Sequence, residues 1–266
     1  MQLFNPKFLH FKNHVPLPQS RDGSAMIEFR HFQKSFGKKQ VHRDISFAVE
    51  AGECLGLLGG SGAGKSVILR SLIGLEKPDA GQVLVDGIDI SNMTESELIA
   101  VRRKVAYVFQ NGALFDSMTV YENLAYPLRE HTSMTEMQIR ERISGLLGEF
   151  GLSGNEEVYP ANLSGGMQKR VGLARSIILE PSMVLYDEPT AGLDPYNTIR
   201  IQEMILRLKQ RGVSGIFVTH DMVSAFAVCD RIALIRDGVV AAIGTKEELE
   251  AQSGSLLTRF VQGEEA

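Results

Sequence analysis

Short apolar runs alternate with longer segments of helical periodicity along most of the chain. The runs have the length and the near-continuous hydrophobicity of buried strands, and they lie at 54–59, 105–109, 183–187, 214–220 and 231–238. Amphipathic helices are expected between them, at 66–75, 165–179, 197–211 and 222–229. Strands that alternate with helices predict a parallel sheet covered on both faces, and hence an α/β fold.

Two parts of the chain depart from this alternation. Before the first run, 26–36 and 41–52 have the pattern of strands, and 81–87 adds another after the first helix. From Leu114 to Leu163 the pattern is mostly helical, with helix starts at Thr119 and Thr135 and a helix end near Pro127. We therefore expect a split α/β core with a helical insert near residues 112–162.

Composition and charge narrow the class of protein. The chain has 266 residues, of which 44% are hydrophobic and 23% charged, as in ordinary globular domains. The formal net charge is −4, so no basic excess points to nucleic acid, and no nucleic-acid partner is expected. No apolar run approaches the length of about 18 residues that spans a bilayer.

The stretch "GGSGAGKS" follows the first apolar run and opens a helix. This context fits the P-loop pattern G-x-x-x-x-G-K-[ST], in which backbone N–H groups surround a phosphate. Lys65 would reach the β/γ-phosphates, and the Ser66 hydroxyl would bind Mg²⁺. The remaining positions of this predicted nucleotide site are Gly59, Gly60, Ser61, Gly62, Ala63 and Gly64.

A second chemical signal is the strand "MVLYD", which ends in adjacent carboxylates, Asp187 and Glu188. On its own such a strand end is more often a solvated turn. Beside a P-loop it predicts that Asp187 holds Mg²⁺ and that Glu188 orients and deprotonates the attacking water.

Two more polar residues follow strands of the same sheet. Ligands of open α/β sheets bind outside the carboxyl ends of the strands, where these residues are expected to meet. His220 could reach the γ-phosphate there, although a lone histidine is usually structural. Gln110 could contact Mg²⁺ or the water.

The segment "NLSGGMQKRVGLARS" contains a further helix start with small residues, Ser164, Gly165 and Gly166. A helix N-terminus with free N–H groups can bind an anion, but it can also be a simple helix cap. On its own the segment favours the helix cap, whereas in the company of the other motifs it favours the anion site.

Taken in order, "GGSGAGKS", Gln110, "LSGG", "MVLYDEPT", "GLDP" and His220 resemble the nucleotide-binding subunit of an ABC transporter. The resemblance covers nearly all of residues 26–245 and implies a P-loop NTPase fold with a RecA-like core, an antiparallel β subdomain and the helical insert. It implies ATP and Mg²⁺ as cofactors. It also implies a homodimer in which Ser164 and Gly166 grip the γ-phosphate of ATP bound to the other copy. Asp194 would bridge the copies.

The same resemblance assigns less specific positions. Phe36 takes the place of the aromatic residue that stacks on adenine, and Val41 would flank it. Met167 stands where the family commonly has Gln, which leaves the glycines and the serine in place. The expected domains are an extension at 1–24, the ATPase domain at 25–246 and a tail at 247–266.

The segment "GALFDSMTVYENLAYPLREHT" is similar to the corresponding segment of the ATPases of Mla/Mce-type lipid transporters. That likeness implies a separate transmembrane permease, an Mce-domain lipid-binding protein, and a cytoplasmic position at the inner membrane through the permease. Four side chains, Tyr121, Leu124, Tyr126 and Leu128, would either line a groove for a permease helix or pack the insert. Other cargoes, such as an amino acid, and a role outside transport, in DNA repair or translation, stay open as alternatives.

Overall fold

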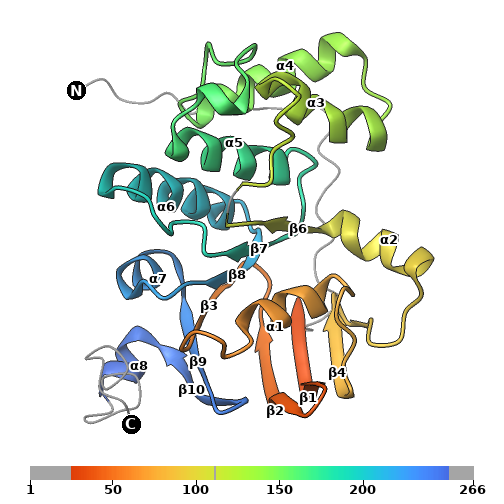
Figure 1. Ribbon diagram of the computed structural model, residues 1–266, viewed down its shortest axis with the longest axis vertical. Helices are drawn as coiled ribbons and strands as arrows, with labels where there is room; N and C mark the ends of the chain where they lie inside the picture. Colours follow the sequence, from red (N-terminus) through yellow and green to blue (C-terminus); the bar gives the residue numbers. More distant parts are fainter. Residues whose placement is uncertain (1–24, 111, 252–266) are drawn as a thin grey trace.

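The computed structural model in Figure 1 describes residues 25–110 and 112–251, so the predicted extension and most of the predicted tail lie outside the described residues. Within them the strands are β1 (Ile27–Phe36), β2 (Lys39–Val49), β3 (Cys54–Leu58), β4 (Ala80–Val85), β5 (Ile88–Asp89), β6 (Val105–Val108), β7 (Met183–Asp187), β8 (Ser214–Val218), β9 (Arg231–Arg236) and β10 (Val239–Thr245). The helices are α1 (Lys65–Leu72), α2 (Glu95–Lys104), α3 (Val120–His131), α4 (Glu136–Glu149), the 3₁₀ turn η1 (Pro160–Asn162), α5 (Gly165–Ile177), α6 (Pro195–Gln210), α7 (Met222–Val228) and α8 (Lys246–Ala251). None of the helices in the two described ranges is long and apolar enough to cross a membrane.

The described strands form one sheet in the order β5-β4-β1-β2-β10-β9-β3-β8-β7-β6. Its parallel part, from β9 to β6, contains all five apolar runs that predicted buried strands. Every residue of β3 and β8 is buried, as expected for strands with helices on both faces. The predicted parallel sheet is therefore confirmed for this part of the fold.

The rest of the sheet is largely antiparallel, because β1 pairs with β2 and β4, and β10 pairs with β9. Strands β5 and β10 and helix α8 were not predicted. The Asp237–Gly238 turn, with φ of 50° and 75°, joins β9 to β10 and is a typical hairpin signal. The predicted strand end at Gly52 is wrong, since β2 ends at Val49 and Gly52 lies in a turn with φ of 77°.

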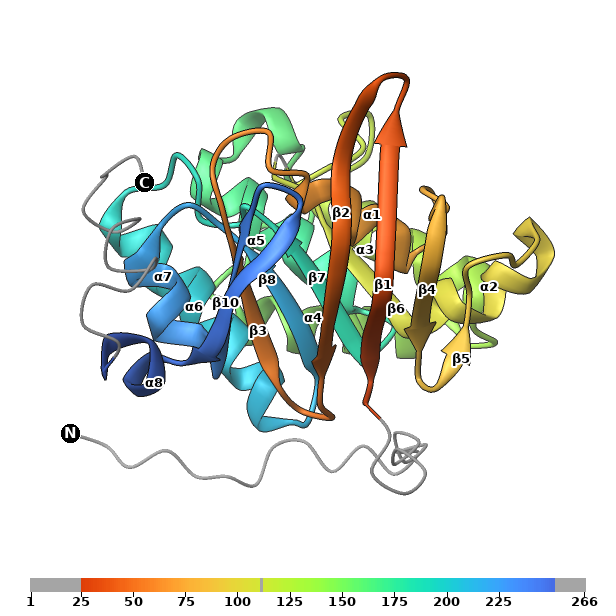
Figure 2. The same ribbon diagram turned by 90° about the horizontal axis from the view of Figure 1, so that it is seen from below.

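Helix α1 lies between the antiparallel strands and the parallel strands, as Figure 2 shows from below. Its buried side chains, Ile68, Leu69 and Leu72, belong to one apolar cluster with Phe29 and Phe32 of β1. The same cluster reaches residues of β3, β7 and β8 across the helix. Burial of this kind fixes the helix, and with it the loop at its N-terminus, on two sides.

A second apolar cluster covers the other face of the parallel strands with helices α3 to α6. The predicted helical insert is confirmed as α3, α4 and η1. The predicted helix end at Pro127 is wrong, because α3 continues through this proline to His131. Leu128, just beyond the proline, is 1% exposed, so packing against the insert outweighs the hydrogen bond that proline cannot donate.

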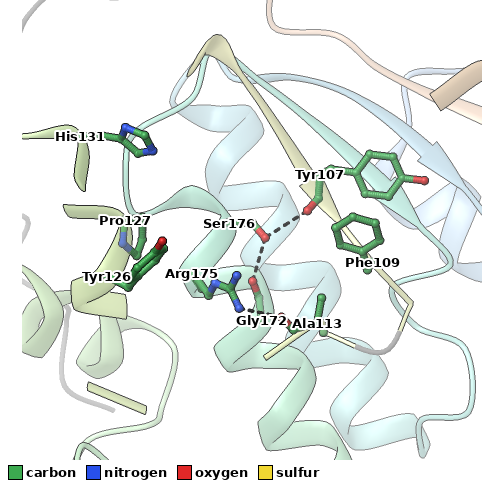
Figure 3. A pocket seen from close by; sticks show the side chains of 10 residues that line it. Tyr107, Phe109, Ala113, Tyr126, Pro127, His131, Gly172, Arg175 and Ser176 are labelled. Atoms are coloured by element: carbon green, nitrogen blue, oxygen red, sulfur yellow. Dashed lines mark hydrogen bonds between the residues drawn. The ribbon is translucent and has the colours of Figure 1, made fainter. Parts of the chain in front are cut away.

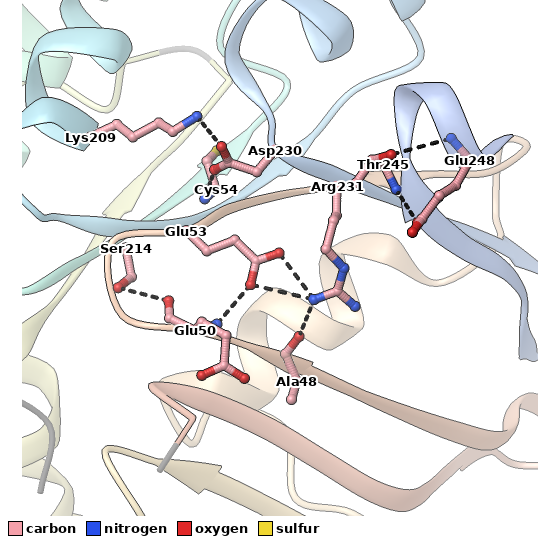
Figure 4. A network of polar contacts seen from close by, with 10 residues as sticks. All are labelled: Ala48, Glu50, Glu53, Cys54, Lys209, Ser214, Asp230, Arg231, Thr245 and Glu248. Carbon is pink, nitrogen blue, oxygen red and sulfur yellow. Dashed lines mark hydrogen bonds and ion pairs between the residues drawn. The ribbon is translucent and has the colours of Figure 1, made fainter. Parts of the chain in front are cut away.

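Polar contacts hold together the amino ends of the central strands (Figure 4). Arg231 at the start of β9 pairs with Glu53 before β3 at 3.1 Å, and Asp230 accepts from the N–H of Cys54 at 2.9 Å. Lys209 of α6 pairs with the same Asp230. These contacts lie at the amino edge of the sheet, whereas ligands of α/β sheets bind at the opposite, carboxyl edge.

Candidate active site

The loop from Gly59 to Ser66 joins the carboxyl end of β3 to the N-terminus of α1. Gly62 and Gly64 have φ of 78° and 85°, in the left-handed region that glycine adopts without strain. Lys65 turns its Nζ back over the loop and donates to the carbonyls of Gly59 at 2.7 Å and Gly60 at 3.1 Å. Burial lowers the pKa of Lys65, while the nearby carboxylates of Glu188 and Asp187 oppose this shift.

Strand β2 packs directly beneath this loop. A Cβ added at Gly64 would overlap Val41 and the ring of His42, so the close approach depends on glycine. His42 is fully buried, and its Nε2 lies 3.1 Å from the Gly64 carbonyl. Val41 thus lies beside the loop, and its expected place next to the adenine stays a prediction, whereas His42 was not predicted. Phe36, at the end of β1, keeps 45% of its surface exposed, with Lys34 Nζ 5.3 Å from the ring centroid.

Asp187 ends β7 and accepts two hydroxyl hydrogen bonds, one on each oxygen. Ser66 Oγ of α1 donates to Oδ1 at 3.3 Å, and the Tyr107 hydroxyl of β6 donates to Oδ2 at 2.7 Å. The two predicted metal ligands, Ser66 and Asp187, are therefore neighbours in space although 121 residues separate them. Tyr107 is a member of this cluster that sequence reasoning missed.

Glu188 follows β7 with φ of 51°, an uncommon value for a residue other than glycine. Nδ1 of His220 lies 2.9 Å from its Oε2, so the two predicted catalytic residues meet at the carboxyl ends of adjacent strands. The alignment is not that of a hydrogen bond, which leaves this buried oxygen without a hydrogen-bond partner. Backbone strain and an unpartnered carboxylate oxygen are both typical of functional sites.

Gln110 lies on an exposed turn two residues after Val108, which pairs with Tyr186 of β7. It therefore lies at the same edge of the sheet as Asp187.

The start of α5 carries Ser164, whose Oγ accepts from the Met167 N–H at 3.3 Å as a helix cap. Ser164 and Gly165 are exposed, and Gly166 is buried against Asn197 of α6. Asn197 Nδ2 donates to Asp194 at 2.6 Å, and Asp194 caps α6. One carboxamide thus connects two regions that the sequence marked separately.

A lysine ties the same helix to the loop after the carboxylates. Nζ of Lys169 donates to the carbonyl of Ala191, and burial lowers the lysine pKa while Glu188 raises it. Among the residues that the structure describes, α5 packs on one face of the sheet and α1 on the other (Figure 1).

A cavity of about 250 Å³ opens between β6, α3 and α5 (Figure 3). Its lining is aromatic and partly polar, and consists of Tyr107, Phe109, Gly112, Ala113, Tyr126, Pro127, His131, Gly172, Arg175 and Ser176. Of the four side chains predicted for a groove or for the insert core, Tyr126 lines this cavity. The other three, Tyr121, Leu124 and Leu128, are buried within the insert.

Comparison with known proteins gives the same family as the motifs. The family model described as "ABC transporter" matches residues 42–191, more than half of the chain. This chain belongs to the ABC transporter family. It carries an ABC ATPase domain, which uses ATP and Mg²⁺ and hydrolyses ATP in step with transport.

Curated relatives of this ABC ATPase differ in what their names say they transport. The "Probable ribonucleotide transport ATP-binding protein mkl" of Mycobacterium leprae is 40% identical over 89% of this chain and 69% of its own length. A "Methionine import ATP-binding protein MetN" of Haemophilus ducreyi is 38% identical over 89% of this chain and 70% of its own. The chloroplast "Protein TRIGALACTOSYLDIACYLGLYCEROL 3" of Arabidopsis thaliana is 36% identical over 91% of this chain and 75% of its own.

A solved structure with the same fold is the dimeric post-hydrolysis state of the ATP-binding cassette MJ0796 with ADP and Pi. It has a TM-score of 0.76 and 30% sequence identity, and the match covers 83% of this chain and 98% of that one. Domains of this family work as dimers beside membrane permeases.

The residues present fit ATP and Mg²⁺. A Cβ added at Gly60 or Gly62 would meet nothing within 4 Å, so the loop is open on the side where a phosphate would lie. Hydroxyl and carboxylate oxygens, the donors that Mg²⁺ prefers, converge at Ser66 and Asp187. Glu188 follows Asp187 directly in the chain, and its buried Oε2 has no hydrogen-bond partner.

Proposed function

We propose that this ABC ATPase powers the movement of lipids between bacterial membranes through a separate permease. In this proposal it works as a homodimer, and each ATP lies between Lys65 of one copy and Ser164 of the other. The observation that carries the dimer is the position of the two anion sites. The P-loop helix α1 and the Ser164 helix α5 pack on opposite faces of one sheet, so a second copy supplies the missing half of each site.

Each predicted residue has a place in the proposed cycle. The backbone of Gly59 to Gly64 and the Lys65 ammonium hold the phosphates, and Phe36 and Val41 contact the adenine. Ser66 and Asp187 hold Mg²⁺, which when bound neutralises charge on the β/γ-phosphates, and Gln110 reaches the metal or the water.

Glu188 orients the attacking water and takes its proton, while His220 donates to the γ-phosphate. Ser164, Gly165 and Gly166 bind that phosphate from the other copy, and Asp194 links the copies. ATP binding can do work because it favours the closed dimer over the open one.

The proposal of a lipid cargo is based on the sequence of the insert rather than on the catalytic residues. The sequence from Gly112 to Thr132 resembles that of the Mla/Mce-type ATPases, and one relative bears the name of a lipid, trigalactosyldiacylglycerol. The names of two other relatives refer to ribonucleotide and to methionine, so a small solute is the second candidate.

Partner binding is assigned to the cavity between β6, α3 and α5. Tyr126 and Pro127 form its rim on α3, and aromatic side chains with an apolar face suit a cytoplasmic helix of the permease. The partners in this proposal are an Mla/Mce-type permease and, through it, an Mce-domain lipid-binding protein. The chain would then lie on the cytoplasmic face of the inner membrane.

The decisive experiment combines trapping with cargo identification. Glu188→Gln should bind Mg-ATP, remain a closed dimer on a sizing column and lose about 10²–10⁴-fold in turnover. Normal turnover of this variant would refute the role of Glu188.

Purification of the trapped complex from membranes should also recover a permease, an Mce-domain protein and bound phospholipid. Recovery of a solute permease without bound lipid would leave the ATPase assignment intact but would replace lipid by a small solute as the proposed cargo. Tyr126→Ala should abolish this recovery, whereas Ile99→Ala, an exposed change on α2, should not.

A further inference from the structure

The Asp187 carboxylate is held from two elements that come from distant parts of the chain. Ser66 of α1 bonds one oxygen, and Tyr107 of β6 bonds the other with the shorter distance, 2.7 Å. A carboxylate that accepts a hydrogen bond on each oxygen cannot rotate without breaking one of them. Its orientation therefore depends on Tyr107 as well as on the P-loop helix.

Tyr107 is the donor in its hydrogen bond with Asp187. Its hydroxyl donates to Asp187 Oδ2 at 2.7 Å. An ionised carboxylate can only accept, so this hydrogen bond has one direction.

The same tyrosine is in contact with the proposed permease cavity. Its ring lies 4.3 Å from the ring of Phe109, centroid to centroid, and Phe109 lines the cavity with 49% of its surface exposed. Its carbonyl accepts from Ser176 Oγ of α5 at 3.3 Å. Figure 3 shows this carbonyl directed toward Ser176, with the phenol ring directed away beside Phe109.

We propose that Tyr107 is a positioning residue that orients Asp187 for Mg²⁺ and connects this carboxylate to the occupant of the cavity. The inference rests on the proposed roles of Asp187 and of the cavity. Whatever binds the cavity contacts Phe109, Phe109 contacts the phenol ring, and the phenol holds the metal-binding carboxylate. The path from partner to metal is two aromatic side chains long.

Calorimetry of ADP binding to the full chain tests the first half of the inference. The measured quantity is the ratio of the ADP dissociation constant with EDTA to that with Mg²⁺. Loss of a hydrogen bond to a metal ligand typically weakens metal binding about 10–100-fold, so Tyr107→Phe should reduce this ratio about 10-fold or more.

The Tyr107→Phe variant should keep its ADP affinity in EDTA, which reports an intact P-loop. Tyr121→Phe is the matched control, because Tyr121 also donates to a carboxylate, Glu136 at 3.4 Å, but within the insert. This control should leave the ratio unchanged. An unchanged ratio in Tyr107→Phe, or an equal loss in Tyr121→Phe, would overturn the inference.

A double-mutant cycle tests the connection to the cavity. Phe109→Ala removes the ring that packs on Tyr107 and should reduce the Mg²⁺ ratio in the same direction. Combined with Tyr107→Phe it should cause no further loss, because both changes act through one hydrogen bond. Additive losses would show that Phe109 acts independently and would refute the connection.

These outcomes are separable from the proposed function. If Glu188→Gln traps an ATP-bound dimer while Tyr107→Phe keeps its Mg²⁺ ratio, the ATPase mechanism stands and only this inference fails. If Glu188→Gln turns over normally while the ratio falls in Tyr107→Phe, the assignment of the general base fails and Tyr107 retains its role.

Discussion

His220 Nδ1 lies 2.9 Å from Glu188 Oε2, across the carboxyl ends of β8 and β7. The carboxylate is largely buried, with 16% of its side chain exposed, and the imidazole is largely exposed, with 72% exposed. The exposed histidine thus lies against a buried carboxylate at the edge of the sheet where ligands of α/β folds bind.

Replacing this histidine should separate binding from chemistry. In His220→Ala the P-loop and Lys65 are unchanged, so ATP should bind with similar affinity. Loss of one donor to the transferred phosphate typically costs about 10²–10³-fold in kcat. Steady-state ATPase assays and equilibrium nucleotide binding measure the two effects. Val223→Ala, an exposed change just beyond His220, should leave both unchanged, and wild-type kcat in His220→Ala would refute the role.

Mixed dimers test whether each site takes residues from two copies. Ser164→Arg should block the contact with the partner's ATP, and Lys65→Ala should block binding at the P-loop. A heterodimer of the two variants has one site with both lesions and one with neither, so ATPase activity should recover in part. Wild-type activity of the Ser164→Arg homodimer would contradict the shared site.

Gly166 and Asn197 should control dimer closure through their close packing. A Cβ at Gly166 would overlap the Asn197 carboxamide, which bonds Asp194. Gly166→Ala should therefore displace Asn197 and weaken the ATP-trapped dimer in the Glu188→Gln background, as measured by sizing with light scattering.

ADP binding to the Gly166→Ala monomer should persist. Gly145→Ala in α4 adds a methyl group in open space and should leave the dimer unchanged. Equal dimer stability in both variants would show that Asn197 does not contribute to dimer closure.

Stability should depend on pH through His42. Burial lowers the pKa of His42 below its usual 6.5, although the Gly64 carbonyl opposes this shift. Below pH 6.5 the unfolded chain binds a proton that the folded chain binds less readily, so this contribution to stability is lost as pH falls.

His42→Leu should reduce the decrease in Tm between pH 7 and roughly pH 5. Thermal melts of both proteins across this range measure the slope, and the absolute Tm at pH 7 controls for lost packing. An identical slope would show that His42 does not titrate differently on folding.

The apolar runs predict the strands of the parallel sheet, and the motifs predict most of the candidate site residues but not Tyr107 or His42, because runs and motifs are local signals. Strand β10 was not predicted, although the Asp237–Gly238 pair is a typical hairpin signal. The residues of β10 are mostly apolar like those of β9, so the two strands were not told apart. The partners of the site residues are a different matter. Tyr107 and Asp187 are 80 residues apart, and Gly166 meets Asn197 only after α5 and α6 pack. Such pairs depend on the three-dimensional fold, which no spacing of residues along the chain encodes.

Helix α1 is enclosed by strands on both sides, so the loop that precedes it is already shaped before any nucleotide arrives. Preorganised groups lose little conformational entropy on binding. Binding of ATP to this loop should therefore cost little conformational entropy. In the proposed homodimer, the entropic cost would fall instead on bringing two copies together. Binding of ATP to one copy and closure of the proposed dimer would therefore have separate entropic costs.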